Sequence, residues 1–339
     1  MRVLQAMAGR KEGGAERFFA RLVIALDNAG IKQHVLIRNS AACAGWLRQG
    51  GMSAVELPFG GRLDLLTARR FRKEIEQFKP QVVLTWMNKA TRFCPKPNGF
   101  IHVGRLGGYY NLKYYRSCHH LVANTSDIVD YVNKMGWKKS IHYLPNFAHA
   151  IPAKPASRRA LDTPEHAPLV LSLGRLHHNK GFDVLLRAMM HVPEAYLWIA
   201  GTGPLENELF HSVNELGLVG RVRFLGWRDD VAALHAAADV YVCPSRHEPL
   251  GNVIIEAWAQ GKPVVSAASK GPAELITNEE SGLLVQVDDV IGLSDAIRRV
   301  FTDKTLADRL ATGGFRAYEN EFTESIVVGR YISFLKKLA

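Results

Sequence analysis

Two glutamates in one short segment are the residues of this chain best placed to do chemistry. Glu248 and Glu256 lie eight residues apart, with Pro249, Gly251 and Asn252 between them. On one continuous helix such a pair would be about 80° out of register. Pro249 biases Glu248 toward an extended conformation, and Asn252 is a favourable helix N-cap. The sequence therefore predicts Glu248 on a loop and Glu256 about one turn inside the following helix.

The backbone between the two carboxylates suits an anion. The N–H groups near Leu250, Gly251 and Asn252 point outward at the predicted helix N-terminus, where a phosphate binds well. Carboxylates on both sides of a phosphate site fit a ligand with hydroxyl groups on both sides of a diphosphate. A nucleotide sugar is such a ligand.

Two cations, Arg175 and Lys180, lie five residues apart in a loop that follows the apolar segment 169–173. Ligands of open parallel sheets bind beyond the carboxyl ends of the strands, so both cations are expected at the ligand. A leaving nucleotide diphosphate gains about two negative charges, which fixed cations stabilise in the transition state. The prediction is therefore a metal-free site without a cofactor; surface ion pairing is the alternative for the two cations.

Four blocks of sequence occur in an order typical of one enzyme family. They are Gly13-Gly14-Ala15-Glu16, Gly174-Arg175-Leu176 with Asn179-Lys180-Gly181, Ile199-Ala200-Gly201-Thr202-Gly203-Pro204-Leu205, and the Glu-x7-Glu segment followed by Gly261-Lys262-Pro263. With them the whole chain resembles the retaining nucleotide-sugar glycosyltransferases of family 4, among them bacterial enzymes of lipopolysaccharide and envelope-glycan synthesis. The resemblance implies the α/β GT-B fold: two Rossmann-like parallel-sheet domains facing a central cleft, with a C-terminal helix packing back on the first.

The resemblance also implies roles for individual residues. Glu256 is the expected acceptor of a ribose hydroxyl, and Glu248 is expected to contact the donor sugar. Retention is implied through a front-face substitution, in which the departing phosphate oxygen takes the proton of the acceptor hydroxyl. The expected catalytic residues are Arg175, Lys180 and Glu248, and the expected donor-binding residues are Gly13, Gly14, Gly174, Gly201, Gly203, Trp227, Arg228, Leu250, Gly251, Asn252 and Glu256.

One neighbourhood departs from the family pattern. Many members place a histidine after the strand equivalent to 100–103, whereas His102 alternates within that segment and could simply be buried. Arg105 is the more plausible side chain to reach the cleft. The expected acceptor-binding residues are Arg105, Gly107, Gly108, Tyr109 and Asn124.

Length and pattern predict the domain organisation. The chain has 339 residues, more than the roughly 250–300 that one core usually holds. Apolar segments alternate with helical ones, which predicts βαβ units and parallel sheets. We expect an acceptor-binding domain over residues 1–150, a proline-rich linker over 151–167 and a donor domain over 168–320. Residues 321–339 are expected to cross back to the first domain.

Charge is distributed unevenly between the two halves. Residues 1–150 hold 23 Lys and Arg against 9 Asp and Glu, a net charge of +14, whereas residues 151–339 hold 20 against 23. The first half is therefore expected to meet an anionic partner, either an anionic glycan acceptor or an anionic membrane. The helical segment 62–79 carries basic residues beside a stripe predicted to hold Leu65, Leu66, Phe71, Ile75 and Phe78. It is predicted to be either a membrane-surface helix or a domain helix with its apolar side in the core and its basic side exposed to solvent.

The remaining features concern the compartment. The four cysteines are scattered, which fits reduced thiols in the cytoplasm. No segment has the length of a signal peptide or a membrane span. These observations predict a cytoplasmic enzyme, peripheral on the inner face of the plasma membrane.

The leading interpretation is transfer of a sugar from a nucleotide donor, UDP-linked first and GDP-linked next, to a hydroxyl of an anionic glycan. An epimerase or a phosphorylase on the same fold is the enzymatic alternative. Outside enzymes, the basic half could bind nucleic acid, which would make binding steeply salt-dependent. No segment has the pattern of a known nucleic-acid fold, so no nucleic-acid partner is expected.

Overall fold

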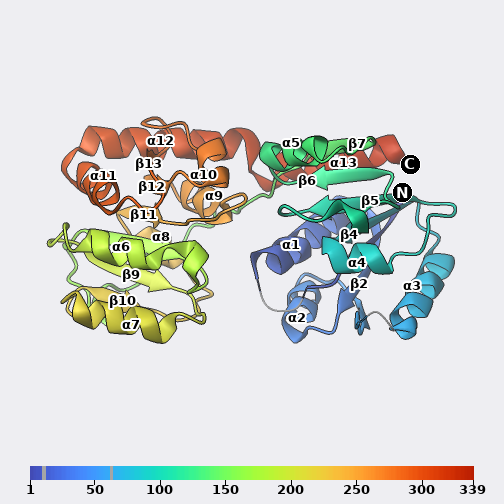
Figure 1. The fold of residues 1–339 in the computed structure, drawn as a ribbon, viewed down its shortest axis with the longest axis horizontal. Helices are drawn as coiled ribbons and strands as arrows, with labels where there is room; N and C mark the ends of the chain where they lie inside the picture. The colour runs from blue at the N-terminus through green and yellow to red at the C-terminus, as the bar shows by residue number, and fades with distance from the viewer. Residues whose placement is uncertain (10–12, 62–63) are drawn as a thin grey trace. The chain divides into compact units, whose positions relative to one another are not determined.

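The chain folds into two units, each built around a parallel sheet (Figure 1). The computed structural model describes residues 1–9, 13–61 and 64–339. The first unit comprises Met1–Phe147 together with Glu324–Ala339, and the second comprises Ala148–Thr323. The two parallel-sheet α/β units confirm the predicted fold class.

The described part of the first unit contains a seven-stranded sheet in the order β3-β2-β1-β4-β5-β6-β7, with every neighbouring pair parallel. Strand β1 is buried on both faces: Val3 and Met7 belong to one core cluster, and Leu4 and Ala6 belong to another. The strands are β1 (Arg2–Met7), β2 (Lys32–Arg38), β3 (Val55–Leu57), β4 (Val82–Trp86), β5 (Ile101–Leu106), β6 (His120–Ala123) and β7 (Ser140–Tyr143).

Helices cover both faces of this sheet. Phe19 and Leu22 of α1 pack in the core cluster of one face, and Phe71 and Ile75 of α3 pack in that of the other. The helices are α1 (Gly14–Asn28), α2 (Ala41–Gln49), α3 (Leu65–Phe78), α4 (Met87–Phe93), the short η1 (Leu112–Tyr114), α5 (Ser126–Lys134) and α13 (Glu324–Leu338).

The last helix, α13, belongs to the first unit although it follows the second in the chain. Its residues Val327, Tyr331, Phe334 and Leu335 are buried in the same core cluster as α1. In Figure 1 the red α13 accordingly lies among the blue and green elements of the first unit. The helical C-terminus thus completes the core of the first unit.

The described second unit is built on a six-stranded sheet in the order β10-β9-β8-β11-β12-β13, also parallel throughout. Its strands are β8 (Leu169–Leu173), β9 (Tyr196–Ala200), β10 (Val222–Phe224), β11 (Val240–Cys243), β12 (Val264–Ala267) and β13 (Leu283–Val285). Its helices are η2 (Arg159–Leu161), η3 (His178–Lys180), α6 (Phe182–Met189), α7 (Glu206–Glu215), α8 (Val231–Ala237), α9 (Asn252–Ala259), α10 (Lys270–Leu275), α11 (Val290–Thr302) and α12 (Lys304–Glu321).

The stretch 151–167, predicted as a linker, packs on the second unit. The Arg158 guanidinium donates to the carbonyl oxygen of Ala237 at 2.6 and 3.1 Å. The indole N–H of the buried Trp198 donates to the Thr163 hydroxyl at 2.9 Å. These bonds make the proline-rich stretch part of the second unit rather than a free connection.

No helix in the described ranges is long and apolar enough to span a membrane.

Candidate active site

The candidate site of the second unit lies at the carboxyl edge of its sheet. In a parallel sheet the carboxyl ends of all strands meet at one edge. The loops after β8, β9 and β11 therefore lie together. They carry most of the residues of this unit that were predicted to bind the donor, whereas Trp227 and Arg228 follow β10. Each loop begins directly after a buried strand. The last strand residues are Leu173 in β8, Ala200 in β9 and Cys243 in β11.

Glycines allow the first two loops to pack on each other. A Cβ atom on Gly201 would lie 1.9 Å from the carbonyl oxygen of Gly174, and one on Gly203 would lie 2.2 Å from that of Leu176. Gly174 and Gly201 have φ angles of 156° and 140°, which side chains rarely adopt. Both loops also exchange backbone hydrogen bonds, including one of 3.0 Å from the Leu176 N–H to the Thr202 carbonyl. The structure thus gives these predicted donor-binding glycines a packing role.

A second close approach brings Lys180 to Glu248. Gly181, at φ 66°, lies against the Pro244 carbonyl, where a Cβ would come within 2.1 Å of the oxygen. The His247 N–H donates to the Asn179 carbonyl at 3.1 Å. As a result the Lys180 ammonium donates to the Glu248 carboxylate. Two residues 68 positions apart in sequence, both predicted to be catalytic, are therefore direct partners.

The electrostatics of this pair favour its charged form. Burial alone would lower the pKa of Lys180, but the Glu248 carboxylate raises it above its usual value. The Ser245 hydroxyl donates to the same carboxylate at 3.4 Å. A charged lysine held in place this way can stabilise negative charge on a neighbouring leaving group.

Helix α9 begins differently from the prediction. Asn252 was expected as the N-cap, but it is the first helical residue, and Gly251 is the cap. Gly251 has a φ of 90°, in the left-handed region that favours glycine. The Glu248 carbonyl accepts a hydrogen bond of 2.9 Å from the Gly271 N–H. Glu256 lies in the second turn of α9 and is partly exposed, as the sequence indicated.

The other predicted cations of the donor set differ in environment. Arg175 is exposed and follows Gly174 at the end of β8. Arg228 instead pairs with Asp230, at 2.7 and 2.5 Å. Trp227 is 48 % exposed. Leu250 is buried beneath the loop.

One residue of this region was missed from the sequence. The Arg246 guanidinium bonds both carboxylate oxygens of Asp183 at 2.7 Å and donates to Asp288 at 2.6 Å. It also donates to the His178 carbonyl at 2.9 Å. Arg246 therefore ties the loop that carries Glu248 to the loop that carries Lys180. In the sequence, only its position two residues before Glu248 indicated that Arg246 could belong to the site.

In the first unit, the glycine-rich loop precedes α1. Gly13 is the N-cap, with an extended φ of −162°, and Gly14 is the first helical residue. Residues 10–12 of this loop lie outside the described residues. A Cβ atom on Gly9 would meet a carboxylate oxygen of Glu16 at 2.0 Å, and one on Gly13 would meet the other at 2.9 Å. Burial raises the pKa of the Glu16 carboxyl, which lies close to Gly9 and Gly13.

Arg105 is buried rather than directed into a cleft. Its side chain is stacked over Trp86 at 4.1 Å and is only 4 % exposed. It donates to the Tyr331 hydroxyl at 2.9 Å and to the Asn146 amide oxygen at 2.5 Å. These contacts join β5 to α13, so Arg105 has a structural role in the first unit. They do not support the predicted role in acceptor binding.

The other predicted acceptor residues lie on the loops that follow β5 and β6. The Tyr109 hydroxyl donates to Asp127, and Gly107 and Gly108 precede it. Asn124 is buried, and its amide oxygen has no hydrogen-bond partner among the described residues.

His102 is buried, as the alternation suggested. One of its ring nitrogens lies 2.9 Å from the Thr85 hydroxyl. Burial lowers the pKa of His102 to about 3, so the ring is neutral near pH 7.

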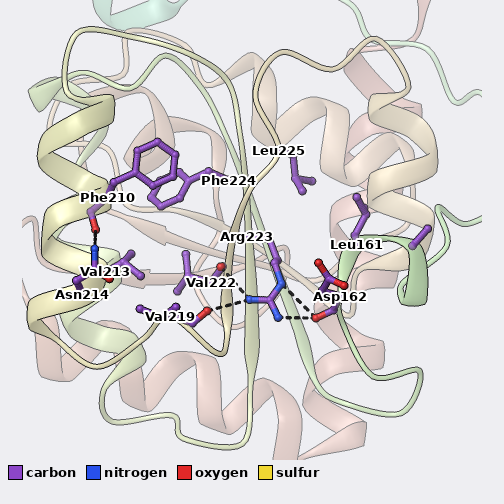
Figure 2. A pocket seen from close by; sticks show the side chains of 11 residues that line it. Leu161, Asp162, Phe210, Val213, Asn214, Val219, Val222, Arg223, Phe224 and Leu225 are labelled. Carbon is purple, nitrogen blue, oxygen red and sulfur yellow. Dashed lines mark hydrogen bonds between the residues drawn. The ribbon is translucent and has the colours of Figure 1, made fainter.

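A separate hollow lies at the edge of the second sheet, beside β10 (Figure 2). It has a volume of about 360 Å³, and the rings of Phe210 and Phe224 lie together on one side of it at 4.5 Å. The Arg223 guanidinium makes five hydrogen bonds there, all to backbone carbonyls. Its N–H donors are therefore already used, and none of the residues predicted to bind the donor lines the hollow.

Comparison with known proteins decides the family. Residues 153–316 match the model described as glycosyl transferases group 1. The chain is 38 % identical over 330 residues to the lipopolysaccharide core biosynthesis glycosyltransferase LpsE of Rhizobium meliloti (strain 1021), covering 96 % of each chain. The protein belongs to the group 1 glycosyltransferases. LpsD of the same strain, also named a lipopolysaccharide core biosynthesis glycosyltransferase, is 38 % identical over 332 residues, again covering 96 % of each chain.

Among solved structures, this group 1 glycosyltransferase shares its fold with HepE from Anabaena, crystallised with UDP and glucose. The TM-score is 0.86 at 22 % identity, and the match covers 99 % of this chain and 100 % of HepE. At this identity the likeness shows the fold alone, which is the predicted GT-B architecture.

Proposed function

We propose that this glycosyltransferase moves a sugar from a nucleotide-sugar donor to a hydroxyl of an anionic glycan of the lipopolysaccharide core type. The donor class rests on the carboxyl edge of the second sheet, where the Lys180–Glu248 pair lies beside the N-terminus of α9. The acceptor class rests on the names of LpsE and LpsD, which match this chain along nearly its whole length. A UDP-sugar is the first candidate donor because HepE was crystallised with UDP, and a GDP-sugar is the next.

In this proposal each site residue has a separate role in donor binding or in stabilising the leaving group. Lys180 and the exposed Arg175 stabilise the negative charge that develops on the leaving diphosphate. Backbone N–H groups at the start of α9 hold a phosphate, and Glu256 accepts a hydroxyl of the nucleoside. Glu248 orients the ammonium of Lys180 before the donor binds and contacts the donor sugar afterwards.

The stereochemical outcome in this proposal is retention without a metal ion. A retaining reaction commonly uses a carboxylate nucleophile with a second acid–base carboxylate. Glu248 is ion-paired with Lys180, which makes it a weak nucleophile. The proposed route is therefore a front-face substitution in which the leaving phosphate oxygen takes the proton of the acceptor.

The experiment is a binding and turnover screen with UDP, GDP and ADP and their hexose conjugates. Thermal shift identifies the nucleotide because a ligand that binds the folded state raises its apparent stability. Transfer is then followed on deacylated core oligosaccharide with and without EDTA, and NMR assigns the anomeric configuration of the product. Loss of activity in EDTA rules out the metal-free route, and an inverted product rules out retention.

The same screen tests the alternatives. An epimerase would convert the sugar nucleotide without any acceptor. A phosphorylase would need inorganic phosphate and no nucleotide. Either outcome replaces the proposed transfer.

We propose that the enzyme acts in the cytoplasm, peripheral on the inner face of the plasma membrane. Nucleotide sugars are the substrates in this proposal, and the net charge of +14 on residues 1–150 favours an anionic surface.

A further inference from the structure

Helix α3 exposes two leucines in its first turn. Leu65 is 79 % exposed and Leu66 is 56 % exposed, although the sequence pattern placed both on one stripe with Phe71, Ile75 and Phe78. The core-facing side of α3 is instead formed by Thr67, Phe71 and Ile75. Single exposed apolar side chains are ordinary, but two adjacent ones at the end of a helix form a small apolar surface that needs a reason.

The backbone beneath these leucines is held firmly. Asp64 caps the helix: its carboxylate accepts from the Thr67 N–H at 2.9 Å, from the Thr67 hydroxyl at 2.5 Å and from the Gly60 N–H at 2.6 Å. The Thr67 hydroxyl also accepts from the Phe59 N–H at 3.0 Å. These bonds fix the backbone of the first turn. Contact of the two leucines with a partner therefore costs no further backbone entropy.

The water-facing side of α3 is basic. Arg69, Arg70, Arg72 and Lys73 are all exposed, and none of them has an ion-pair partner among the described residues. At about 100° per residue, Arg69 and Lys73 fall between Leu65 and Leu66 on the helix projection. The apolar tip and the cations therefore share one face.

Two cations of α4 bond the segment that precedes α3. The Arg92 guanidinium donates to the Gly61 carbonyl at 3.2 Å, and the Lys89 ammonium donates to the Phe59 carbonyl at 2.9 Å. Two acids lie near the cations on α3: Glu74, whose carboxylate lies 2.8 Å from the His34 ring, and the exposed Glu76. We call Leu65 and Leu66 with the cations Arg69, Arg70, Arg72 and Lys73 the α3 tip.

This combination fits a bilayer better than any other anionic partner. Cations alone would suit nucleic acid or a soluble anionic glycan equally well. Two exposed leucines gain nothing from either, but they are stabilised at the boundary between headgroups and acyl chains, where adjacent cations also meet lipid phosphates.

We propose that the α3 tip docks the protein on an anionic bilayer, with Leu65 and Leu66 inserted below the headgroups and the four cations on the lipid phosphates. The proposal rests on the proposed function only in that a membrane-linked acceptor gives the docking a purpose. Charge attraction brings the protein to the surface, and the leucines fix which face meets it.

The test is co-sedimentation of the full chain with phosphatidylcholine vesicles, with and without phosphatidylglycerol. Leu65→Ser/Leu66→Ser is expected to lower the partition coefficient on anionic vesicles by about tenfold or more. Its matched control, Met135→Ser/Ile151→Ser, removes two other exposed apolar side chains (59 % and 52 % exposed) and is expected to bind like wild type.

Charge is tested in the same way. Arg69→Gln/Lys73→Gln is expected to weaken binding by about tenfold or more, because each cation near an anionic lipid surface adds to the attraction. The equal charge change in Lys134→Gln/Lys138→Gln, at exposed residues of α5 and the turn after it, is expected to have a smaller effect.

Each outcome decides the proposal. Equal binding to neutral and anionic vesicles, no binding to either, or equal loss in test and control variants overturns it. Wild-type binding by the leucine variant together with competition by soluble core oligosaccharide would make the surface a glycan site instead. Binding of UDP, GDP and ADP is measured by calorimetry on every variant. Retained nucleotide binding with failed docking rejects the α3 tip alone, whereas a wild-type protein that binds none of the three rejects the proposed function.

Discussion

The ammonium of Lys180 and the carboxylate of Glu248 are paired across two loops that glycines allow to touch. The pairing holds the cation in place, so little reorganisation is needed when charge develops on the leaving group. Lys180 follows β8 and Glu248 follows β11, so the pair also links two loops of the candidate donor site.

Replacing Lys180 by alanine is expected to lower kcat at saturating donor by about 100-fold or more, since it removes the cation and leaves Glu248 unpaired. Steady-state kinetics with the donor found by the nucleotide screen checks this, with circular dichroism to confirm folding. Lys304→Ala, at an exposed residue of α12, is the control. A Lys180→Ala enzyme with near-wild-type kcat would remove Lys180 from the chemistry.

Glu256→Ala is expected to weaken nucleoside-diphosphate binding by about 1.5–3 kcal/mol, the range for a hydrogen bond to a charged group. Calorimetry on the purified variant measures the affinity directly. Glu208→Ala, an exposed acid on α7, should bind like wild type. Unchanged affinity in Glu256→Ala would place the nucleoside elsewhere.

Gly201→Ala should destabilise the second unit by about 2 kcal/mol or more, because its Cβ would overlap the Gly174 carbonyl oxygen and its φ of 140° is unfavourable for alanine. Urea unfolding followed by fluorescence gives the free energy of unfolding. Gly220→Ala, with no atom within 4 Å of its Cβ, is the matched substitution and should stay within about 0.5 kcal/mol of wild type.

His235 makes stability depend on pH. It is fully buried in α8, and neither ring nitrogen has a hydrogen-bond partner among the described residues. Burial, followed by the charge of Lys262, lowers its pKa to about 3. The unfolded chain takes up a proton below about pH 6.5 while the folded ring does not, so this contribution to stability falls as pH falls from about 6.5 toward 3.

His235→Leu is therefore expected to raise the free energy of unfolding and to flatten its pH dependence by up to about 1.4 kcal/mol per pH unit. Urea titrations between neutral pH and pH 5 measure both quantities. The exposed His166 provides the comparison, since His166→Leu should leave the slope unchanged. An equally steep slope in His235→Leu would show that other groups cause the acid sensitivity.

The central strands could be predicted from the sequence because strands buried on both faces are continuous apolar runs. Strand β8, for example, has the bounds of the apolar segment read from the sequence, Leu169–Leu173. The edge strands β3 and β7 were not predicted. Each is only partly buried, and Ser140 and His142 give β7 a polar composition.

The two leucines of α3 show where periodicity fails. Leu65 and Phe71 are six residues apart, which places them about 120° apart on a helix. Once Phe71 faces the core, Leu65 must face water, and only the position of the Asp64 cap determines where the helix starts.

The candidate site could be predicted in part. The glycine and charge motifs marked Lys180 and Glu248, which the fold brings into contact. Arg246 could not be found this way because its partners Asp183 and Asp288 lie 63 and 42 residues away in the chain. Only the folded loops bring these charges together. Arg105 was expected at the cleft together with Gly107 and Gly108, but its guanidinium is buried and bonds the Tyr331 hydroxyl and the Asn146 amide oxygen.

The placement of α13 has a consequence for biosynthesis. The first unit needs Val327, Tyr331 and Leu335 to complete its core, yet the ribosome makes these residues after all of 148–323. At 5–20 residues per second the interval is roughly 10–35 s. The second unit, whose residues are continuous in the chain, can therefore complete its fold first. During this interval the apolar surface of α1 that α13 later covers stays exposed and can bind chaperones.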